Sequence, residues 1–427
     1  MSLTKPKHIK AFNINNLKKF FLNLIMLTVT IFTIASCSNK ESTTDIKQTT
    51  AVSKAAKSAN KYDVAAFYWP SQHYDERWAK FFKDGSLGEW ESIRETKPKW
   101  EGHWQPRKPQ WGYQVGNDPK AMEQKIEAAT SHGVNVMIFD WYWFENKPFL
   151  EGALNDGFLK AKNVDKMNFY IMWANHDANT AWDLRRSHKS EVIWPGSVDF
   201  PTFKTVVARV IKKYFSHPSY YKIDGKPVFS IYDLNNLVKG LDGLDKTKEA
   251  LAYFREEVKK AGFPDLHLQM IYWRKTLKVD ESGFASAKGT ATNTIAALGM
   301  DSVTNYTFTH LARPCGDYIE WAEAATADWP KWSKEFPAPY FPQVSVGWDN
   351  NTRFVEKRCA IEENLNPETF KIYLEKAKAY VDAHPDQAPL ITINAWNEWV
   401  EGSYLEPDER FGMRYLEAVK EVFVESK

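Results

Sequence analysis

Two glutamates near the C-terminus, Glu398 and Glu401, have the spacing and the neighbours expected for acid–base chemistry. They lie three residues apart in the segment Trp396–Pro407, directly after an apolar, strand-like run. Hydrolysis of a glycosidic bond needs one carboxyl group that protonates the leaving oxygen and a second that acts as base or nucleophile. An apolar neighbour such as Trp399 raises the pKa of one acid while the other stays ionised. The pair therefore predicts glycosidic-bond chemistry; two acids on a solvated helix face, or capping a helix, are the alternative.

Aromatic side chains recur beside Asn, Asp or Glu at the ends of the predicted strands. Sugars are bound by this mixture, because the C–H face of the sugar stacks on a ring while its hydroxyls need donors and acceptors. A phosphate site would need glycine-rich turns with Lys or Arg, which these strand ends do not offer. Closing the top of the core is the alternative role for each ring. The candidate substrate-binding residues are Tyr68, Trp69, Asp140, Trp141, Asn175, His176, Tyr232, Trp273, Tyr306, Trp348, Asn397 and Tyr404.

The elements that position these residues alternate between apolar β-rich runs and amphipathic helical runs. Eight strands, each followed by a helix and buried on both faces, predict an α/β fold, a closed parallel (β/α)8 TIM barrel. A doubly wound open sheet is the alternative. The predicted strands are 64–68, 134–141, 168–174, 227–232, 266–272, 302–307, 343–347 and 390–395. The predicted helices are 119–132, 152–162, 202–215, 246–261, 292–298, 318–335, 367–383 and 408–424.

Four long connections follow strands rather than helices: residues 69–118, 175–201, 273–291 and 348–366. In a barrel of this type, the loops after the strands lie at the C-terminal face, where such enzymes build their sites. We therefore expect the candidate residues to converge on that face.

The N-terminal residues predict a lipoprotein of a bacterial cell envelope. A lysine-rich stretch is followed by the apolar run 20–35 and then by Ser36-Cys37. This pattern predicts a signal peptide over residues 1–36 and lipidation of Cys37, with a membrane-spanning anchor helix as the alternative. Residues 37–61 predict a flexible tether, because they are rich in Ser, Thr, Ala and Lys. Residues 62–427 remain for a single catalytic domain.

The amino-acid composition limits the kinds of molecule that the protein is expected to bind. The formal net charge is +2, so no nucleic-acid surface is indicated. Cys315 and Cys359 are too few for a disulfide framework, and no Cys/His spacing suggests zinc; we expect no metal and no cofactor. The 18 Trp and 19 Tyr residues exceed the needs of a core. We expect a monomer whose partner is a carbohydrate and which meets the membrane only through its lipid anchor.

The closing segment, from Trp396 to Asp408, resembles the WbsX-like group related to glycoside hydrolase family 99. The stretches Phe139–Trp143, His217–Val228 and Val346–Asn350 resemble the same group. Family 99 proper comprises retaining, endo-acting α-mannosidases on a (β/α)8 barrel without a metal. The resemblance therefore implies a barrel enzyme that acts on a poly- or oligosaccharide, with α-mannosides among the candidates.

In family 99 the motif Asn-Glu-Trp-His-Glu-Gly carries both catalytic glutamates. The resemblance implies that Glu398 deprotonates the sugar 2-hydroxyl, which attacks C1 to give a 1,2-anhydro intermediate, and that Glu401 acts as general acid and then as base. The chain departs from the motif at Val400, where family 99 has His. WbsX-like proteins have also been described as glycosyltransferases, and a non-catalytic glycan-binding surface lipoprotein is the third candidate.

Overall fold

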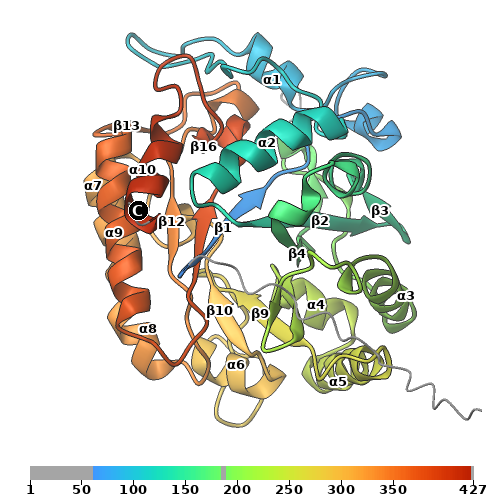
Figure 1. Cartoon of the computed structure of the whole chain (residues 1–427). Coiled ribbons are helices and arrows are strands. Elements are labelled where there is room, and N and C mark those ends of the chain that lie inside the picture. The colour runs from blue at the N-terminus through green and yellow to red at the C-terminus, as the bar shows by residue number, and fades with distance from the viewer. Residues whose placement is uncertain (1–60, 184–188, 425–427) are drawn as a thin grey trace, which may run out of the picture. The chain divides into compact units, whose positions relative to one another are not determined.

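Eight parallel strands form the centre of the fold (Figure 1). The structure is a computed structural model that describes residues 61–183 and 189–424. The expected signal peptide, Cys37 and nearly all of the tether lie outside the described residues. The strands are β1 (Asp63–Tyr68), β2 (Val136–Phe144), β4 (Asn168–Trp173), β8 (Lys226–Ile231), β9 (His267–Ile271), β10 (Ser302–Thr304), β12 (Gln343–Ser345) and β14 (Leu390–Asn394).

These strands are hydrogen-bonded in the order β10-β9-β8-β4-β2-β1-β14-β12, every neighbour parallel. The two outer strands of this order approach each other through a parallel bridge between Val303 and Tyr340. There the backbone N–H of Phe341 donates to the carbonyl of Val303 at 2.8 Å. The sheet is therefore a nearly closed barrel, which confirms the predicted (β/α)8 fold and excludes the open sheet.

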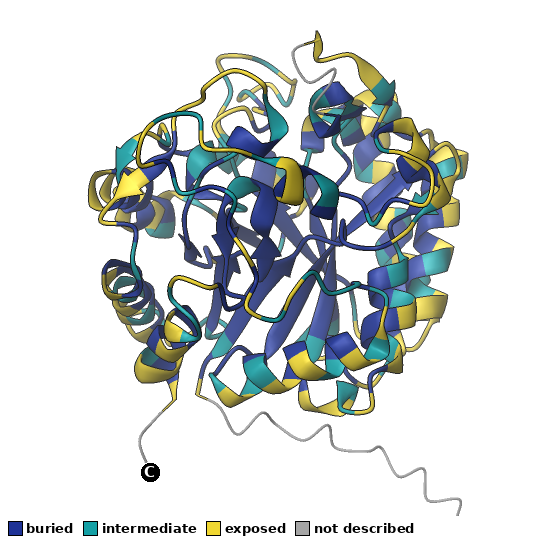
Figure 2. Cartoon of the chain, turned by 90° about the horizontal axis from the view of Figure 1, so that it is seen from above, coloured by how far each residue is buried: buried dark blue, intermediate teal, exposed yellow. Residues whose placement is uncertain are grey.

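The strands are buried on both faces, which explains why their sequences are apolar throughout instead of alternating. All nine residues of β2 are buried. Seen from above, the buried strands occupy the middle of the molecule and the surrounding helices expose their outer sides (Figure 2). Two short strands, β3 (Lys147–Phe149) and β7 (Lys222–Ile223), extend this sheet as antiparallel additions.

The predicted helix boundaries rest on local capping. Helix α2 (Pro119–Ser131) begins after Asp118, whose side chain accepts a hydrogen bond from the backbone N–H of Lys120. Helix α9 (Pro367–Asp382) begins in the same way after Asn366. The other helices around the barrel are α1 (Trp90–Glu95), α3 (Phe200–Val210), α4 (Leu234–Gly240), α5 (Leu244–Lys260), α6 (Ala291–Leu298), α7 (Tyr318–Thr326), α8 (Trp329–Glu335) and α10 (Arg414–Phe423).

Three predicted helices differ from the structure. The single helix predicted over residues 318–335 is two helices, α7 and α8, because Pro330 has no N–H to continue the first and sits in the opening turn of the second. Residues 152–162 form a π-helical turn and a 3-10 turn. The last helix begins at Arg414 instead of Asp408, because the Asp408 carboxylate accepts from the backbone N–H groups of Arg410 and Phe411 and so forms a turn.

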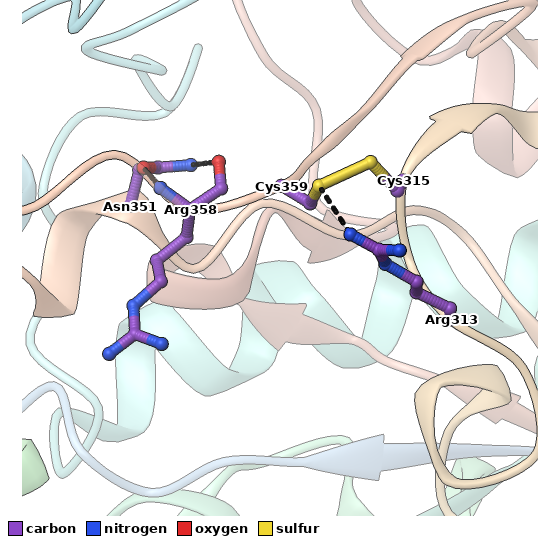
Figure 3. Close-up of a disulfide and its surroundings, with 5 residues drawn as sticks. All are labelled: Arg313, Cys315, Asn351, Arg358 and Cys359. Carbon is purple, nitrogen blue, oxygen red and sulfur yellow. Dashed lines mark hydrogen bonds between the residues drawn. A yellow bond between two sulfur atoms is a disulfide. The ribbon is translucent and has the colours of Figure 1, made fainter.

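The loop that follows β12 is tied to the loop that follows β10. Cys315 and Cys359 form a disulfide beside Arg313 (Figure 3), although their number alone predicted no framework. Next to it, β11 (Gly316–Asp317) pairs in parallel with β13 (Ile361–Glu363). Two loops that are far apart in sequence are therefore fixed to each other at the C-terminal face. In the part of the chain that the structure describes, no helix is both long and apolar enough to cross a bilayer.

Candidate active site

Glu398 and Glu401 lie on a short β-hairpin that follows β14. In this hairpin β15 (Asn397–Glu398) pairs with β16 (Ser403–Tyr404), and a 3-10 turn at residues 399–401 connects them through Gly402. The φ angle of Gly402 is +63°, and a Cβ atom there would lie 2.7 Å from Nη1 of Arg107. Only glycine fits this position without strain. The hairpin therefore holds both glutamates in fixed places, and neither lies on a solvated helix face.

Both glutamates line one cavity of about 230 Å³. Its walls come from residues at or just after the ends of β1, β2, β4, β8, β10, β12 and β14, so it opens at the C-terminal face of the barrel. Of the predicted substrate-binding residues, five line this cavity: Trp69, Asp140, His176, Tyr232 and Tyr306. Lining residues outside the predicted substrate-binding set include Tyr142, Asp177, Asn179, Trp182 and Arg353.

Arg353, on the loop after β12, joins the two glutamates. Its Nη1 lies 2.5 Å from Oε1 of Glu401, and its Nη2 lies 3.2 Å from Oε1 of Glu398. Its Nε donates to a third carboxylate, Glu89 of the loop after β1, at 3.0 Å. Sequence reasoning missed Arg353 and Glu89, because neither lies in a motif; their place in two of the long connections was the only signal.

Burial sets the protonation of this group. It raises the pKa of Glu398 well above its usual value and also raises the pKa of Glu401, while the positive charge of Arg353 opposes both shifts. The negative charge of Glu401 adds to the shift on Glu398. Two deeply buried carboxyl groups that interact with each other and share one arginine favour retention of a proton. The pair can therefore supply an acid and a base together.

A hydrogen-bonded chain connects Glu398 to Asp140 through Tyr306. The Tyr306 hydroxyl lies 2.9 Å from Oδ2 of Asp140 and 3.2 Å from Oε2 of Glu398. A hydroxyl has one hydrogen, so both contacts are full hydrogen bonds only when one of the two carboxyl groups is protonated. Burial also raises the pKa of Asp140 well above its usual value. The other oxygen of Asp140, Oδ1, is buried without a hydrogen-bond partner in the protein.

Aromatic rings form part of the cavity wall. The Trp69 and Trp182 rings lie 5.7 Å apart between centroids, and Tyr142 contacts His176 edge to face at 5.6 Å. Burial lowers the pKa of His176, so its ring is neutral near pH 7. The cavity therefore combines flat rings with carboxylates, the combination that binds a sugar.

Seven predicted substrate contacts lie outside this cavity, and for these residues the structure indicates other roles. Successive side chains of a strand point to opposite faces, so a strand end can direct only alternate residues inward. Asp140 faces the cavity, whereas Trp141 donates to Glu151 at 2.7 Å, a carboxylate that Arg209 of α3 also holds. The seven residues are Tyr68, Trp141, Asn175, Trp273, Trp348, Asn397 and Tyr404.

Several of these side chains position the cavity walls instead. Asn397 accepts from the backbone N–H of Trp69 and donates to its carbonyl, both at 2.8 Å, and so fixes the hairpin to the loop after β1. Asn175 bonds the backbone of Asp233 in the same two-way manner. Tyr404 stacks on Trp399 with ring centroids 3.7 Å apart.

The remaining three pack within the protein. Tyr68 is buried beside Lys125 of α2, whose Nζ lies 5.5 Å from the ring centroid. Trp273 lies against Tyr232, with centroids 6.0 Å apart. Trp348 is partly buried against the main core.

Val400 points away from the cavity. It is 1 % exposed and belongs to a small separate core with Trp90, Ile93, Trp399 and Tyr404. The position where family 99 has His is therefore used here for packing between the hairpin and α1, and it leaves both glutamates in the cavity.

Fold and site together define a (β/α)8 barrel protein with a buried carboxylate pair at the end of its last strand. The chain belongs to the family described as "Glycosyltransferase WbsX", whose model matches residues 64–419. It is 27% identical over 368 residues to the uncharacterized protein WxcX of Xanthomonas campestris pv. campestris. That match covers 84% of this chain, and the chain spans about half (49%) of the length of that relative.

Two solved structures share the fold. The first is the GH99 endo-alpha-mannosidase from Bacteroides thetaiotaomicron, with a TM-score of 0.54, 18% identity, and coverage of 84% of this chain and 95% of that one. The second is described as a glycoside hydrolase-like protein, with a TM-score of 0.53, 14% identity, and coverage of 86% and 94%. At these identities the likeness shows a common barrel architecture.

Proposed function

We propose that this protein is a glycoside hydrolase that cleaves a bond within a poly- or oligosaccharide. The observation that carries the proposal is that Glu398 and Glu401 line one cavity and share one arginine, Arg353. Buried carboxyl groups with raised pKa values are costly to a fold and are characteristic of catalytic sites. The aromatic rings of the same cavity supply the stacking surface for the substrate.

The roles follow the resemblance to family 99. The pKa shifts alone would favour the reverse assignment, because the pKa of Glu398 is raised more strongly than that of Glu401, and the activated substrate described below distinguishes the two assignments. Glu398 removes the proton of the sugar 2-hydroxyl, and the 2-oxygen forms a bond to C1 as the bond from C1 to the leaving oxygen breaks. Glu401 gives its proton to that leaving oxygen. Water then attacks C1 of the 1,2-anhydro intermediate, and the bond from C1 to the 2-oxygen breaks. Glu401 takes a proton from the water, and Glu398 returns its proton to the 2-oxygen. Both carboxyl groups end as they began. Tyr306 and Arg353 hold Glu398 in position throughout.

Two other functions remain as alternatives. The family description favours a glycosyltransferase. The lining of the cavity favours a hydrolase, because among the described residues its one arginine, Arg353, is already held by carboxylates and no lysine lines it to bind the phosphates of a nucleotide sugar. A glycan-binding protein without activity would use the aromatic rings but would have no need of two buried acids.

A glycan panel tests the proposal directly. Wild type, Glu398→Gln and Glu401→Gln are incubated with α-mannosides and other oligo- and polysaccharides, and released reducing ends are counted. We expect the wild type to cleave at least one glycan and both variants to lose cleavage while still binding it. Full activity in either variant would refute the assignment. Binding without turnover by the wild type would indicate a binding protein, and transfer from a sugar nucleotide would indicate a transferase.

An activated substrate separates the two glutamates. An aryl glycoside with a good leaving group needs little protonation by an acid. If Glu401 is the acid, Glu401→Gln should recover its first step on that substrate, whereas Glu398→Gln should stay inactive. The reverse pattern would exchange the two roles.

We also propose that the protein works in the cell envelope, anchored through Cys37. The Cys315–Cys359 disulfide supports this location, because such bonds persist in oxidising compartments. Mass spectrometry of the mature N-terminus should find a lipid on Cys37, and Cys37→Ala should release the protein from the membrane fraction. An unmodified Cys37 in a membrane-bound protein would contradict the anchor.

A further inference from the structure

A second cavity lies beside the turn that carries Glu401. Arg107 donates through Nη1 to the carbonyl of Gly402 at 2.8 Å, and the backbone N–H of Asp349 donates to the carbonyl of Glu401 at 2.6 Å. Both Arg107 and Asp349 line this second cavity, whose volume is about 120 Å³. It shares no lining residue with the catalytic cavity. It continues into a wider depression of about 410 Å³ that Gly102, Trp104 and Arg410 also line.

A tryptophan in the lining of the second cavity, Trp104, is contacted by two arginines of the same lining. The guanidinium carbons of Arg107 and Arg410 lie 4.5 and 4.6 Å from the ring centroid of Trp104. Trp104 is partly exposed, so part of its indole is open to a ligand. An indole stacks on the C–H face of a sugar, and a guanidinium binds a carboxylate or a sulfate through two parallel hydrogen bonds.

The arginines of this cavity retain capacity for an anion. Arg107 is 4 % exposed and its Nε is buried without a hydrogen-bond partner. Its nearest acid, Asp349, lies 3.7 Å away and already accepts from His103 and Gln105 at 2.9 and 2.7 Å. Arg410 is exposed, and among residues 61–183 and 189–424 no acidic side chain forms an ion pair with it. Asp349 and Glu362 also line the cavity, so its formal charges balance, and its capacity for an anion rests on the unpartnered Nε of Arg107 and on Arg410.

We propose that the second cavity binds an anionic sugar residue, carrying a carboxylate, sulfate or phosphate group, with its ring on Trp104 and its charge on Arg410 and Arg107. The catalytic cavity favours a neutral residue, because its arginine, Arg353, is already held by Glu398 and Glu401 and is not free to bind an anion. The substrate is then an acidic glycan that places a neutral sugar at the bond and a charged sugar in the second cavity. The inference about the substrate rests on the proposed hydrolase function, whereas the binding of an anionic sugar in the second cavity is independent of it.

Calorimetric titration tests the second cavity without any turnover. The probes are galacturonic acid trisaccharide, its methyl ester, and glucose 6-sulfate. We expect the acid to bind at least about ten-fold more tightly than the ester, because a hydrogen-bonded charge pair is lost in the ester. Arg410→Gln should abolish this difference, and Trp104→Ala should weaken acid and ester alike. Arg274→Gln, which removes an exposed arginine outside both cavities, should change nothing.

The outcomes are distinct. Equal affinity for acid and ester, no effect of Arg410→Gln, or no binding of any anionic probe would overturn the proposal. Preference for glucose 6-sulfate over the uronic acid would identify the anion as a sulfate. Binding of the acid that persists in Glu398→Gln and Glu401→Gln, in a protein that cleaves no glycan, would keep the second cavity and refute the hydrolase. Cleavage of glycans by a protein that shows no preference for anionic sugars would support the hydrolase and refute the anion-binding role of the second cavity.

Discussion

At the scale of single residues, the site is defined by a positive charge among acids. Arg353 contacts Glu398, Glu401 and Glu89, and it opposes the effect of burial on the pKa of both hairpin glutamates. Its own pKa is raised by those three carboxylates even though burial alone would lower it. Arg353 therefore decides how easily the pair ionises, and two measurements follow.

Replacing Arg353 with Gln should shift the pH dependence of activity. Without the guanidinium the pKa values of both glutamates rise further, so the base ionises at higher pH and the acid limb of kcat/KM moves upward. We expect kcat to fall roughly 10²- to 10³-fold, as for loss of one preorganised charge contact. Arg353→Lys keeps the positive charge but loses the planar guanidinium that contacts several carboxylates at once. Its kcat should therefore lie between those of the wild type and Arg353→Gln. An unchanged pH profile in Arg353→Gln would show that Arg353 does not control the pair.

Replacing Glu398 with Gln should stabilise the protein at neutral and high pH. The folded-state pKa of Glu398 is raised above 4.5, so the folded state holds its proton more tightly than the unfolded chain does. The free energy of unfolding then falls as pH rises from the unfolded pKa to the folded pKa, and Gln removes that loss. Tm at pH 8 should rise by about 2 °C or more, which corresponds to about 1 kcal/mol. At pH 4 the gain should vanish, and the exposed Glu375→Gln should show no such trend.

At the scale of elements, the hairpin depends on a buried ion pair with α2. Lys125 Nζ lies 2.5 Å from Oε1 of Glu406, and Glu406 accepts the indole N–H groups of Trp396 and Trp399 at 3.0 and 2.7 Å. One carboxylate thus orients the two tryptophans that frame Glu398. The aromatic and acidic residues of the closing segment are therefore largely a support for the two glutamates.

Replacing Lys125 with Met should destabilise the protein. It leaves the Glu406 carboxylate buried without its counter-charge, so we expect a loss of about 3–5 kcal/mol in the free energy of unfolding. Urea denaturation measures it. Lys120→Met removes an exposed lysine from the same helix and should cost little. Similar stability of the two variants would mean that the ion pair does not hold the hairpin in place.

At the scale of the whole molecule, the barrel brings together loops that are remote in sequence. Arg353 and Glu89 are 264 residues apart, and the loop that carries Arg353 is bound by a disulfide across a separation of 44 residues. The disulfide restricts the conformations of that loop, and it therefore limits the positions that Arg353 can occupy.

Removing the disulfide should weaken both stability and activity. For a closed loop of this length, the entropy of the unfolded chain predicts a loss of about 4 kcal/mol in Cys315→Ser/Cys359→Ser. The looser Arg353 loop should also lower kcat. Guanidinium unfolding and activity are measured with and without a reducing agent. Reduced wild type should behave like the double variant, and a difference between them would locate the effect in the serines instead of the bond.

The sequence by itself determined the eight strands, most of the helices, and the position of the glutamate pair at the end of the last strand. Those features depend on patterns between near neighbours: apolar runs, capping residues such as Asp118, and two acids three residues apart. The helix predictions failed at three places: a local turn replaces the helix start at Asp408, Pro330 divides one helix into two, and residues 152–162 form π-helical and 3-10 turns.

Only the tertiary structure decided which of the strand-end residues reach the cavity. Asp140 and Trp141 are adjacent and equally suited to a sugar site, yet strand geometry sends one inward and the other toward α3. Nothing local marks Arg353 or Glu89, because their meeting requires the barrel to close. Val400 shows the same limit: its side chain packs against Trp90 of α1, so the departure from the family 99 motif lies outside the cavity.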